Sequence, residues 1–265
     1  MSRVANTFQR LSERGEKALI AYLMAGDPTL EDTEAYVQQL AQAGADIIEL
    51  GVPFSDPIAD GPVIQQAAER ALRSGTSLKK ILATVRSLRK KTQIPLVLMA
   101  YYNSIFRYGE AAFCRDAVAA GVDGLIVPDM PPDEAGTIHL LAEKVGLDVI
   151  FLLAPTSTAK RQTSVARLSR GFIYYVSLTG ITGAKLTDKA DVEEKVREIR
   201  RYTKTPVAVG FGIATPEDAR EVARIADGVI VGSALVKVIA EGNHAAVTNR
   251  LTSFTRSLKS ATLPA

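Results

Sequence analysis

The strongest constraint on the fold of this chain is a repeated alternation of short apolar segments with helical patterns. The apolar segments predict eight strands, at 18–25, 45–50, 94–101, 122–127, 148–153, 172–177, 206–209 and 227–231. They are rich in Val, Ile and Leu and lack regular polar alternation, which is typical of parallel strands buried on both faces. Helical spacing of apolar residues predicts helices at 29–43, 62–73, 77–90, 110–120, 133–145, 159–169, 192–202, 215–225, 234–240 and 245–258.

Eight strand–helix units favour a closed (β/α)8 barrel that forms a single domain over residues 1–265. We expect extra helices after the second and eighth strands. A further N-terminal helix, with Val4, Phe8 and Leu11 on one face, is expected to plug one end. An open doubly wound sheet is the alternative. Such a sheet typically has a Gly-x-Gly-x-x-Gly turn after its first strand. In this chain that position holds Gly26-Asp27-Pro28, which does not match the motif.

Three helix-to-strand junctions resemble one another. Residues 43–50, 120–127 and 226–231 each pass from helix to strand through small residues and an aspartate. The likeness supports a repeated unit.

Composition excludes several classes of function. The net charge of +3 is too small to indicate nucleic-acid binding. The short Lys/Arg clusters of the chain are typical of solvated helix faces. No apolar run is long enough to predict a membrane span, and the N-terminal residues lack the apolar core of a signal peptide. The single cysteine, Cys114, precludes an intrachain disulfide and fits a reducing cytoplasm.

Residues 48–61 are the most unusual stretch of the chain. Glu49 lies within an apolar strand, where a carboxylate is costly to bury unless it has a partner or a function. The following loop contains Pro53 and Pro57, which fix the backbone on both sides of Asp56, and it ends at Asp60.

In a barrel, the active site forms at the carboxyl ends of the strands. The polar and glycine-rich positions found there are Tyr22, Asp27, Glu49, Asp56, Asp60, Tyr101, Tyr102, Asn103, Asp129, Thr156, Tyr174, Tyr175, 180–183, 210–212 and 232–233. Gly-Phe-Gly at 210–212 and Gly232-Ser233 follow the last two strands, where barrels commonly bind phosphate through backbone N–H groups. Gly183 follows the sixth strand. Tight turns are the alternative explanation of these glycines.

Acid–base chemistry points to carboxylates. His139 and His244, the only histidines, fall in predicted helices, which disfavours a metal site, a Ser-His-Asp triad and histidine catalysis. Glu49 and Asp60 are the best-placed pair. Desolvation would raise the pKa of Glu49 and suit it to proton transfer near neutral pH. Asp60 could instead cap the helix that begins at Pro62.

The stretch 48–61 closely resembles the signature of the tryptophan synthase alpha subunit family. The motifs at 26–28, 128–131, 180–183, 210–213 and 232–234 follow in the order that this family shows. The resemblance implies a (β/α)8 barrel that reversibly cleaves indole-3-glycerol phosphate to indole and glyceraldehyde 3-phosphate.

Residue by residue, the resemblance implies that Glu49 and Asp60 are the catalytic carboxylates. Asp60 would accept the indole N–H proton, and Glu49 would handle protons at the ring carbon and the side-chain hydroxyl in a retro-aldol cleavage. The implied substrate-binding residues are Tyr22, Ile64, Met99, Tyr174, Thr182 and Phe211, with Gly183, Gly212, Gly232 and Ser233 at the phosphate. Tyr22 stands where many members have Phe, and Thr182 matches a loop threonine that orders Asp60.

The resemblance also implies a beta subunit as partner, in an alpha2–beta2 complex through which indole passes. Pro53, Phe54 and Asp56, with the loop after the sixth strand, would face that partner. Leu178-Thr179 departs from the polar or basic pair of many members. Pyridoxal phosphate is expected only in the beta subunit, with no cofactor or metal in this chain. A plant or algal member would lie in the plastid stroma rather than the cytoplasm.

Two other functions stay open. A stand-alone lyase would use the same acids and release free indole without a partner. A non-catalytic barrel would only bind a phosphorylated metabolite.

Overall fold

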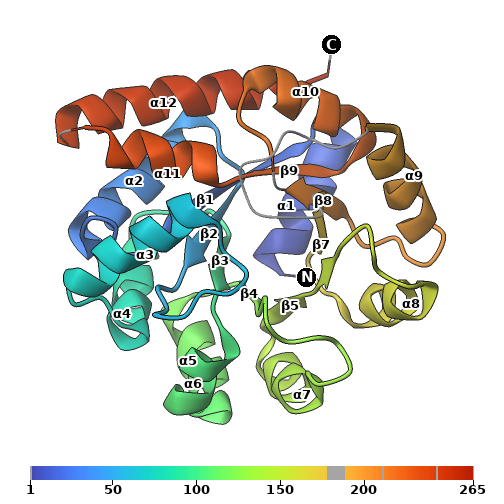
Figure 1. Cartoon of the computed structure of the whole chain (residues 1–265), viewed down its shortest axis with the longest axis horizontal. Helices are drawn as coiled ribbons and strands as arrows, with labels where there is room; N and C mark the ends of the chain where they lie inside the picture. Colours follow the sequence, from blue (N-terminus) through green and yellow to red (C-terminus); the bar gives the residue numbers. More distant parts are fainter. Residues whose placement is uncertain (1, 178–188, 211, 243, 265) are drawn as a thin grey trace.

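The strands form one parallel sheet that closes into a barrel (Figure 1). The computed structural model describes residues 2–177, 189–210, 212–242 and 244–264. Within these ranges, the strands are β1 (Ala18–Met24), β2 (Ile47–Gly51), β3 (Leu96–Met99), β4 (Gly124–Ile126), β5 (Asp148–Ile150), β6 (Leu152–Leu153), β7 (Ile173–Val176), β8 (Val207–Gly210) and β9 (Gly228–Val231). Their spatial order is β5-β4-β3-β2-β1-β9-β8-β7-β6. The predicted barrel is confirmed, and the open doubly wound sheet is wrong.

The predicted strand at 148–153 is divided in the structure. β5 pairs with β4 and β6 pairs with β7, and Phe151 alone separates the two pieces. Strands of a closed barrel are staggered along their length, so one strand can meet its two neighbours at different heights. The division therefore marks the place where the sheet closes.

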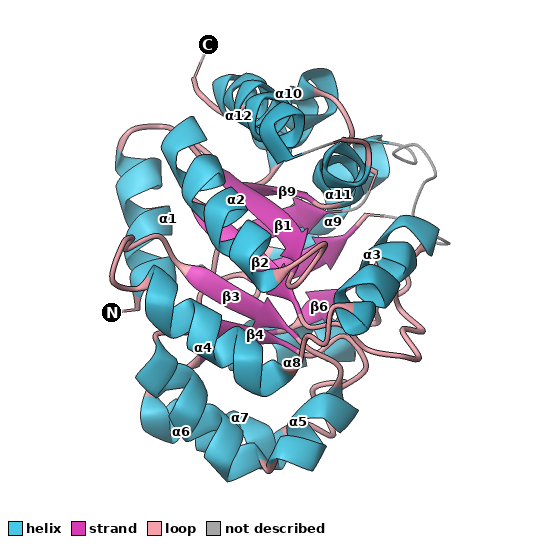
Figure 2. Ribbon diagram, turned by 90° about the vertical axis from the view of Figure 1, so that its left-hand side faces the viewer, coloured by secondary structure: helices cyan, strands magenta, loops and turns pink. Residues whose placement is uncertain are grey.

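Helices surround the barrel on all sides (Figures 1 and 2). They are α1 (Arg3–Glu13), α2 (Leu30–Ala43), α3 (Pro62–Arg73), α4 (Leu78–Leu88), α5 (Tyr102–Tyr108), α6 (Glu110–Ala120), α7 (Gly136–Val145), α8 (Ala159–Leu168), α9 (Lys189–Ile199), α10 (Pro216–Ile225), α11 (Ser233–Ala240) and α12 (His244–Ala261). The predicted extra helices after the second and eighth strands are α3 and α11. Among the described residues, no helix has the length and apolar character to cross a membrane.

One helix was not predicted. The sequence places Tyr102 and Asn103 at the end of a strand, but α5 begins at Tyr102 and ends before Gly109, whose φ of +92° stops it. The carboxylate of Asp129 accepts the Tyr102 N–H at 2.9 Å, across 27 residues of sequence. A hydrogen-bond partner supplied from so far away leaves no local signal in the sequence.

Alternate residues of each strand face the barrel interior and the surrounding helices. Ile47 packs in the interior cluster, whereas Ile48 and Leu50 pack toward the helices. This alternation turns Glu49 inward with Ile47. The side chain of an acid within an apolar strand is thereby enclosed by the barrel.

α1 closes the end of the barrel where the strands begin. Val4 and Phe8 join the interior cluster, and the Phe8 ring lies 5.7 Å from that of Phe172. A Cβ at Gly228 would lie 3.3 Å from the Phe8 ring. Because glycine has no side chain, α1 can pack closely against β9 at this point. The expected plug is therefore in place.

The three similar junctions share a hydrogen bond. Asp46, Asp123 and Asp227 each precede a strand and accept a backbone N–H from the start of the neighbouring strand. The donors are Leu19 at 2.8 Å, Leu96 at 2.8 Å and Val207 at 2.9 Å, respectively. Each carboxylate also binds a cation, in turn Lys259, Arg89 and Arg200. The repeated aspartate thus joins adjacent strands at the end that α1 closes.

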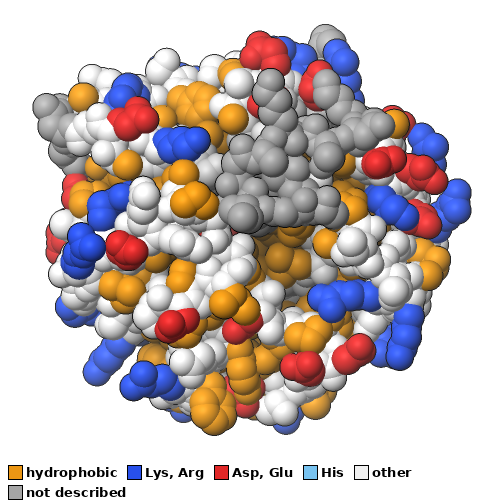
Figure 3. Space-filling view, in the orientation of Figure 1, with side chains coloured by type: hydrophobic (Ala, Val, Ile, Leu, Met, Phe, Trp, Pro, Cys, Tyr) orange, Lys and Arg blue, Asp and Glu red, His pale blue; other side chains and the backbone are white. Residues whose placement is uncertain are grey.

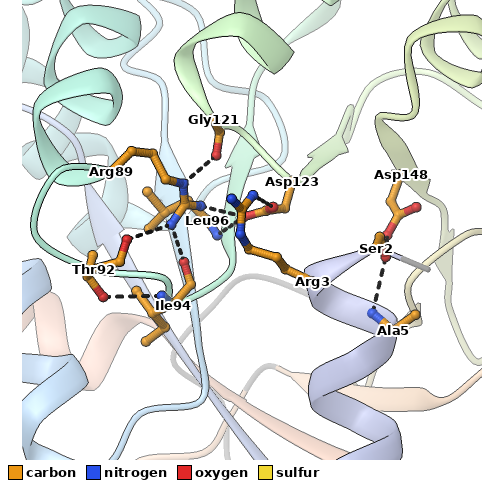
Figure 4. Close-up of polar contacts among 10 residues, drawn as sticks. All are labelled: Ser2, Arg3, Ala5, Arg89, Thr92, Ile94, Leu96, Gly121, Asp123 and Asp148. Carbon is orange, nitrogen blue, oxygen red and sulfur yellow. Dashed lines mark hydrogen bonds and ion pairs between the residues drawn. The ribbon is translucent and has the colours of Figure 1, made fainter.

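The Asp123 side chain is the most buried of the three aspartates. Figure 4 shows its contacts. Its carboxylate binds Arg89 and also Arg3 of α1, the latter at 2.8 Å. Arg89 further donates to the Gly121 and Ile94 carbonyls at 2.7 and 2.6 Å. The network ties α1 to β3 and β4.

Candidate active site

Glu49 is a buried acid in the strand that precedes the Asp60 loop. It lies in β2 at 1% exposure, in register with Tyr22 of β1 and Val97 of β3. Both of its carboxylate oxygens lack a hydrogen-bond partner among the described residues. Desolvation, assisted by the nearby Asp60, raises the pKa of Glu49 to about 8. Such a group can hold and release a proton near neutral pH.

Asp60 ends the loop that follows β2. The cap position of α3 is Gly61, so the alternative that Asp60 caps this helix is wrong. The Asp60 carboxylate instead accepts a hydrogen bond from the Tyr101 hydroxyl, at 3.1 Å. Desolvation raises the pKa of Asp60 to about 6, against the lowering effect of the Tyr101 hydrogen bond. At neutral pH the group is mainly ionised.

A cavity of about 560 Å³, including its open mouth, joins the two acids. Its lining residues are Tyr22, Glu49, Asp60, Ile64, Met99, Tyr174, Gly212, Ile213, Ile230, Gly232 and Ser233. The structure thus brings together nine of the residues named from the sequence. Thr182, Gly183 and Phe211 lie outside the described residues. Figure 3 shows hydrophobic side chains gathered in a hollow near the middle of one face.

Two glycines make room for the tyrosines of the cavity. A Cβ at Gly51 would lie 2.1 Å from the Tyr22 hydroxyl, and one at Gly210 would lie 2.6 Å from that of Tyr174. Burial, reinforced by Asp60 and Glu49, raises the pKa of both phenols well above the ordinary value. Both tyrosines are therefore neutral hydrogen-bonding groups beside the acids.

The part of the cavity lining formed by Gly212, Gly232 and Ser233 suits an anion. Ser233 opens α11, and the N–H groups of Ser233 and Ala234 precede the first backbone bonds of the helix, from Leu235 and Val236 to the Gly232 carbonyl. Gly232 precedes it at the cap position, and Gly212 lies nearby after β8 with φ of +78°. Amides and a hydroxyl at a helix N-terminus favour negative charge.

The loop between β2 and α3 presents both buried and exposed residues. Pro53 is buried, and the half-buried Phe54 stacks on Tyr101 with ring centroids 5.1 Å apart. Asp56 is exposed, and Ile58 is 87% exposed at the tip. The loop therefore has a packed base and an exposed tip.

No metal-binding cluster of three or more His, Cys, Asp or Glu side chains occurs within the described ranges. His139 lies in α7 near Phe151, with ring centroids 6.1 Å apart, and its burial lowers its pKa. His244 is the first residue of α12. The structure therefore places His139 away from the residues that line the cavity.

Three residues of the site were missed or left without a role. Ile230 lies two positions before Gly232, so strand alternation would have placed both on the inner face. Ile213 follows the glycine-rich turn, where no periodic signal applies.

Tyr101 was named only as a strand-end residue. Its contact with Asp60 spans 41 residues, which sequence spacing cannot indicate.

Fold and site together define a class: a (β/α)8 barrel with two carboxylates and an anion-binding wall at the carboxyl ends of its strands. The profile of the family described as tryptophan synthase alpha chain matches residues 8–263. The chain therefore belongs to the tryptophan synthase alpha chain family.

Individual relatives cover nearly the whole chain. The tryptophan synthase alpha chain of Citrifermentans bemidjiense is 54% identical over 263 residues, covering 99% of this chain and 98% of the relative. That of Geobacter sulfurreducens is 52% identical over 261 residues, with coverage of 98% and 99%. The crystal structure of tryptophan synthase subunit alpha from Legionella pneumophila has a TM-score of 0.92 and 40% identity, covering 98% of both chains.

Proposed function

We propose that this chain catalyses the alpha reaction of tryptophan synthase, the cleavage of indole-3-glycerol phosphate to indole and glyceraldehyde 3-phosphate. One observation carries the proposal: the buried Glu49, whose carboxylate has no hydrogen-bond partner among the described residues, lines the same cavity as Asp60. Membership of the tryptophan synthase alpha chain family supports it.

The two acids divide the proton transfers. Asp60, with a pKa of about 6, is ionised at neutral pH and accepts the indole N–H proton. Glu49, with a pKa of about 8, is protonated there and donates to the ring carbon that bears the side chain. The resulting carboxylate of Glu49 takes the proton of the adjacent side-chain hydroxyl. The carbon–carbon bond then breaks, its electron pair returns to the ring, and Asp60 gives the proton back to nitrogen.

The remaining walls suit the two ends of the substrate. Ile64 and Met99 offer an apolar surface for the indole ring, beside the Tyr22 and Tyr174 rings. The phosphate would bind at Gly212, Gly232 and Ser233, which line the same cavity. Thr182, Gly183 and Phe211 keep their proposed roles in the same site. These roles need no cofactor from this chain, and pyridoxal phosphate would belong to the partner.

A tryptophan synthase beta subunit is the proposed partner. The loop that carries Asp60 also carries Phe54, Asp56 and the exposed Ile58, so a bound partner would lie next to a catalytic acid. Pro53 would stiffen this contact from within. We place the complex in the cytoplasm, where a chain with a single buried cysteine needs no oxidising environment.

The test is an assay of indole released from indole-3-glycerol phosphate, with and without a beta subunit. Glu49→Gln and Asp60→Asn are expected to lower kcat by about 10²- to 10⁴-fold while the substrate still binds. Glu31→Gln, an exposed acid of α2, is the control and keeps full activity. Full activity in both site variants would refute the mechanism. Turnover that a beta subunit does not stimulate would favour a stand-alone lyase, and substrate binding without turnover would favour the non-catalytic barrel.

A further inference from the structure

Tyr101 contacts the Asp60 loop at two consecutive residues. Its hydroxyl accepts the Ala59 N–H at 2.9 Å and donates to the Asp60 carboxylate at 3.1 Å. A single oxygen atom therefore links the backbone of the loop to its acid. We propose that Tyr101 is a positioning residue whose hydroxyl fixes the Asp60 carboxylate and the Ala59 backbone in one arrangement.

The Tyr101 ring makes a third contact with the same loop. Phe54 stacks on it with ring centroids 5.1 Å apart and an interplanar angle of 25°. Phe54 and Asp60 lie near the two ends of the loop, so one side chain holds both ends. The ring is thus suited to keeping the loop in place even when the hydroxyl is removed.

Tyr101 is itself held by rigid elements. It is 5% exposed and follows β3, where the preceding Ala100 N–H bonds to the Ile126 carbonyl of β4 at 3.0 Å. It also stands at the cap position of α5, and its carbonyl accepts the Ser104 N–H at 3.0 Å. The hydroxyl therefore projects from the barrel wall, while Asp60 belongs to a loop. A fixed donor can orient a catalytic acid on a loop.

The inference rests on the proposed function of Asp60 as a proton acceptor. A neutral hydroxyl that donates to a carboxylate favours the ionised form and so lowers the pKa of that carboxylate. Because Asp60 must be ionised to accept a proton, loss of the hydroxyl moves the acidic limb of the activity profile to higher pH. Titratable groups around this pair come from several strands and loops; they are Glu49, Tyr22, Tyr174 and, near Tyr101, Asp129.

The test compares Tyr101→Phe with Tyr102→Phe. Both lose one hydroxyl that donates to a carboxylate, but Tyr102 donates to Glu110 outside the cavity, at 3.2 Å. Two quantities are measured: the pH dependence of kcat/KM for indole release, and the titration midpoint of the Asp60 carboxyl by carbon-13 NMR in the ligand-free protein. In Tyr101→Phe both are expected to move up by about 1–2 pH units. Tyr102→Phe is expected to match the wild type.

A third variant separates the hydroxyl from the ring. Phe54→Leu removes the stacking and keeps both hydrogen bonds, so its Asp60 midpoint stays at the wild-type value. An unchanged midpoint in Tyr101→Phe, or an equal shift in Tyr102→Phe or Phe54→Leu, overturns the proposal. The NMR titration does not depend on turnover. If the wild-type protein released no indole, the proposed function would fail while the role of Tyr101 would still be tested.

Discussion

At the scale of single residues, the two acids of the cavity differ in protonation at neutral pH. The pKa of Asp60 is about 6 and that of Glu49 about 8, both raised mainly by desolvation. The proposed reaction needs Asp60 ionised and Glu49 protonated at the start. Both conditions hold together only between these two values.

We therefore predict a bell-shaped pH dependence of kcat/KM for indole release. Activity falls below about pH 6, as Asp60 becomes protonated, and above about pH 8, as Glu49 loses its proton. Because the groups interact, the two limbs report apparent values of the pair. Steady-state kinetics from pH 5 to pH 9.5, in buffers of constant ionic strength, measure the profile. Constant activity across this range would contradict the assignment.

The buried Glu49 also predicts a cost in stability. Its pKa is raised from 4.5 in the unfolded chain to about 8, so its contribution to stability is greatest below pH 4.5 and is lost as pH rises toward 8. Glu49→Gln removes this dependence. Between pH 5 and pH 8 the wild-type protein should lose up to about 3 kcal/mol more unfolding free energy than the variant.

Urea denaturation at the two pH values measures this difference, with Glu31→Gln as the control. Parallel losses of stability in wild type and Glu49→Gln would show that the carboxyl is not desolvated in solution. A larger loss in the wild type would agree with a site that sacrifices stability for proton transfer.

Sequence alone identified Glu49 because its chemistry conflicts with its surroundings. A carboxylate among Ile47, Ile48 and Leu50 stands out without any knowledge of the fold. Tyr101 could not be found in the same way, because a tyrosine after an apolar strand is ordinary. Its partners Ala59 and Asp60 are distant in sequence and meet it only through the pairing of β2 with β3.

At the scale of elements, the strand pairs are reinforced by the repeated aspartates. Asp123 and its partner Arg89 are 5% and 11% exposed at their side chains, whereas Asp227 and Arg200 are 32% and 43% exposed. Removing one charge of a buried pair leaves the other uncompensated, but exposed pairs contribute little. The aspartate junction should therefore contribute more to the free energy of unfolding at Asp123 than at Asp227.

We predict that Asp123→Asn destabilises the protein by about 3–5 kcal/mol, and Asp227→Asn by about 1 kcal/mol or less. Asparagine keeps an oxygen that can accept the strand N–H, so the comparison isolates the charge. Unfolding free energies from urea titration provide the measurement. Equal effects in the two variants would mean that burial does not set the strength of these pairs.

Elements with their own hydrophobic pattern were predictable, and elements defined by distant partners were not. The strand at 45–50 and the helix at 62–73 are apparent from periodicity and from the proline in the first turn of the helix. α5 was missed because Asp129, from the loop after β4, supplies a partner at its N-terminus. The division at Phe151 arises from the stagger between neighbouring strands of a closed sheet. The sequence of one strand does not indicate this stagger.

At the scale of the whole molecule, one end of the barrel carries stabilising contacts and the other carries the cavity. α1 and the aspartate junctions lie where the strands begin, and the cavity lies where the strands end. Changes at the closed end should therefore alter stability without altering substrate recognition.

Phe8→Ala tests this separation. Phe8 is 5% exposed and packs on Phe172 at the closed end, so its loss should cost about 3–5 kcal/mol of unfolding free energy. KM for indole-3-glycerol phosphate should stay close to the wild-type value at temperatures where the variant is folded. Thermal denaturation and steady-state kinetics on the same preparation provide both quantities. A large rise in KM would show that the two ends are coupled.

The fit of the Tyr22 hydroxyl over Gly51 limits how this site can diverge. Alanine at position 51 would place its Cβ 2.1 Å from that oxygen, whereas a small residue at position 22 would leave a hole beside the acids. Neither position can change size alone without a penalty. A descendant of this protein that gains room at these two positions would therefore exchange volume between two neighbouring strands. Divergence along this route depends on paired substitutions, and a library that varies positions 22 and 51 together would reach variants that single-site libraries miss.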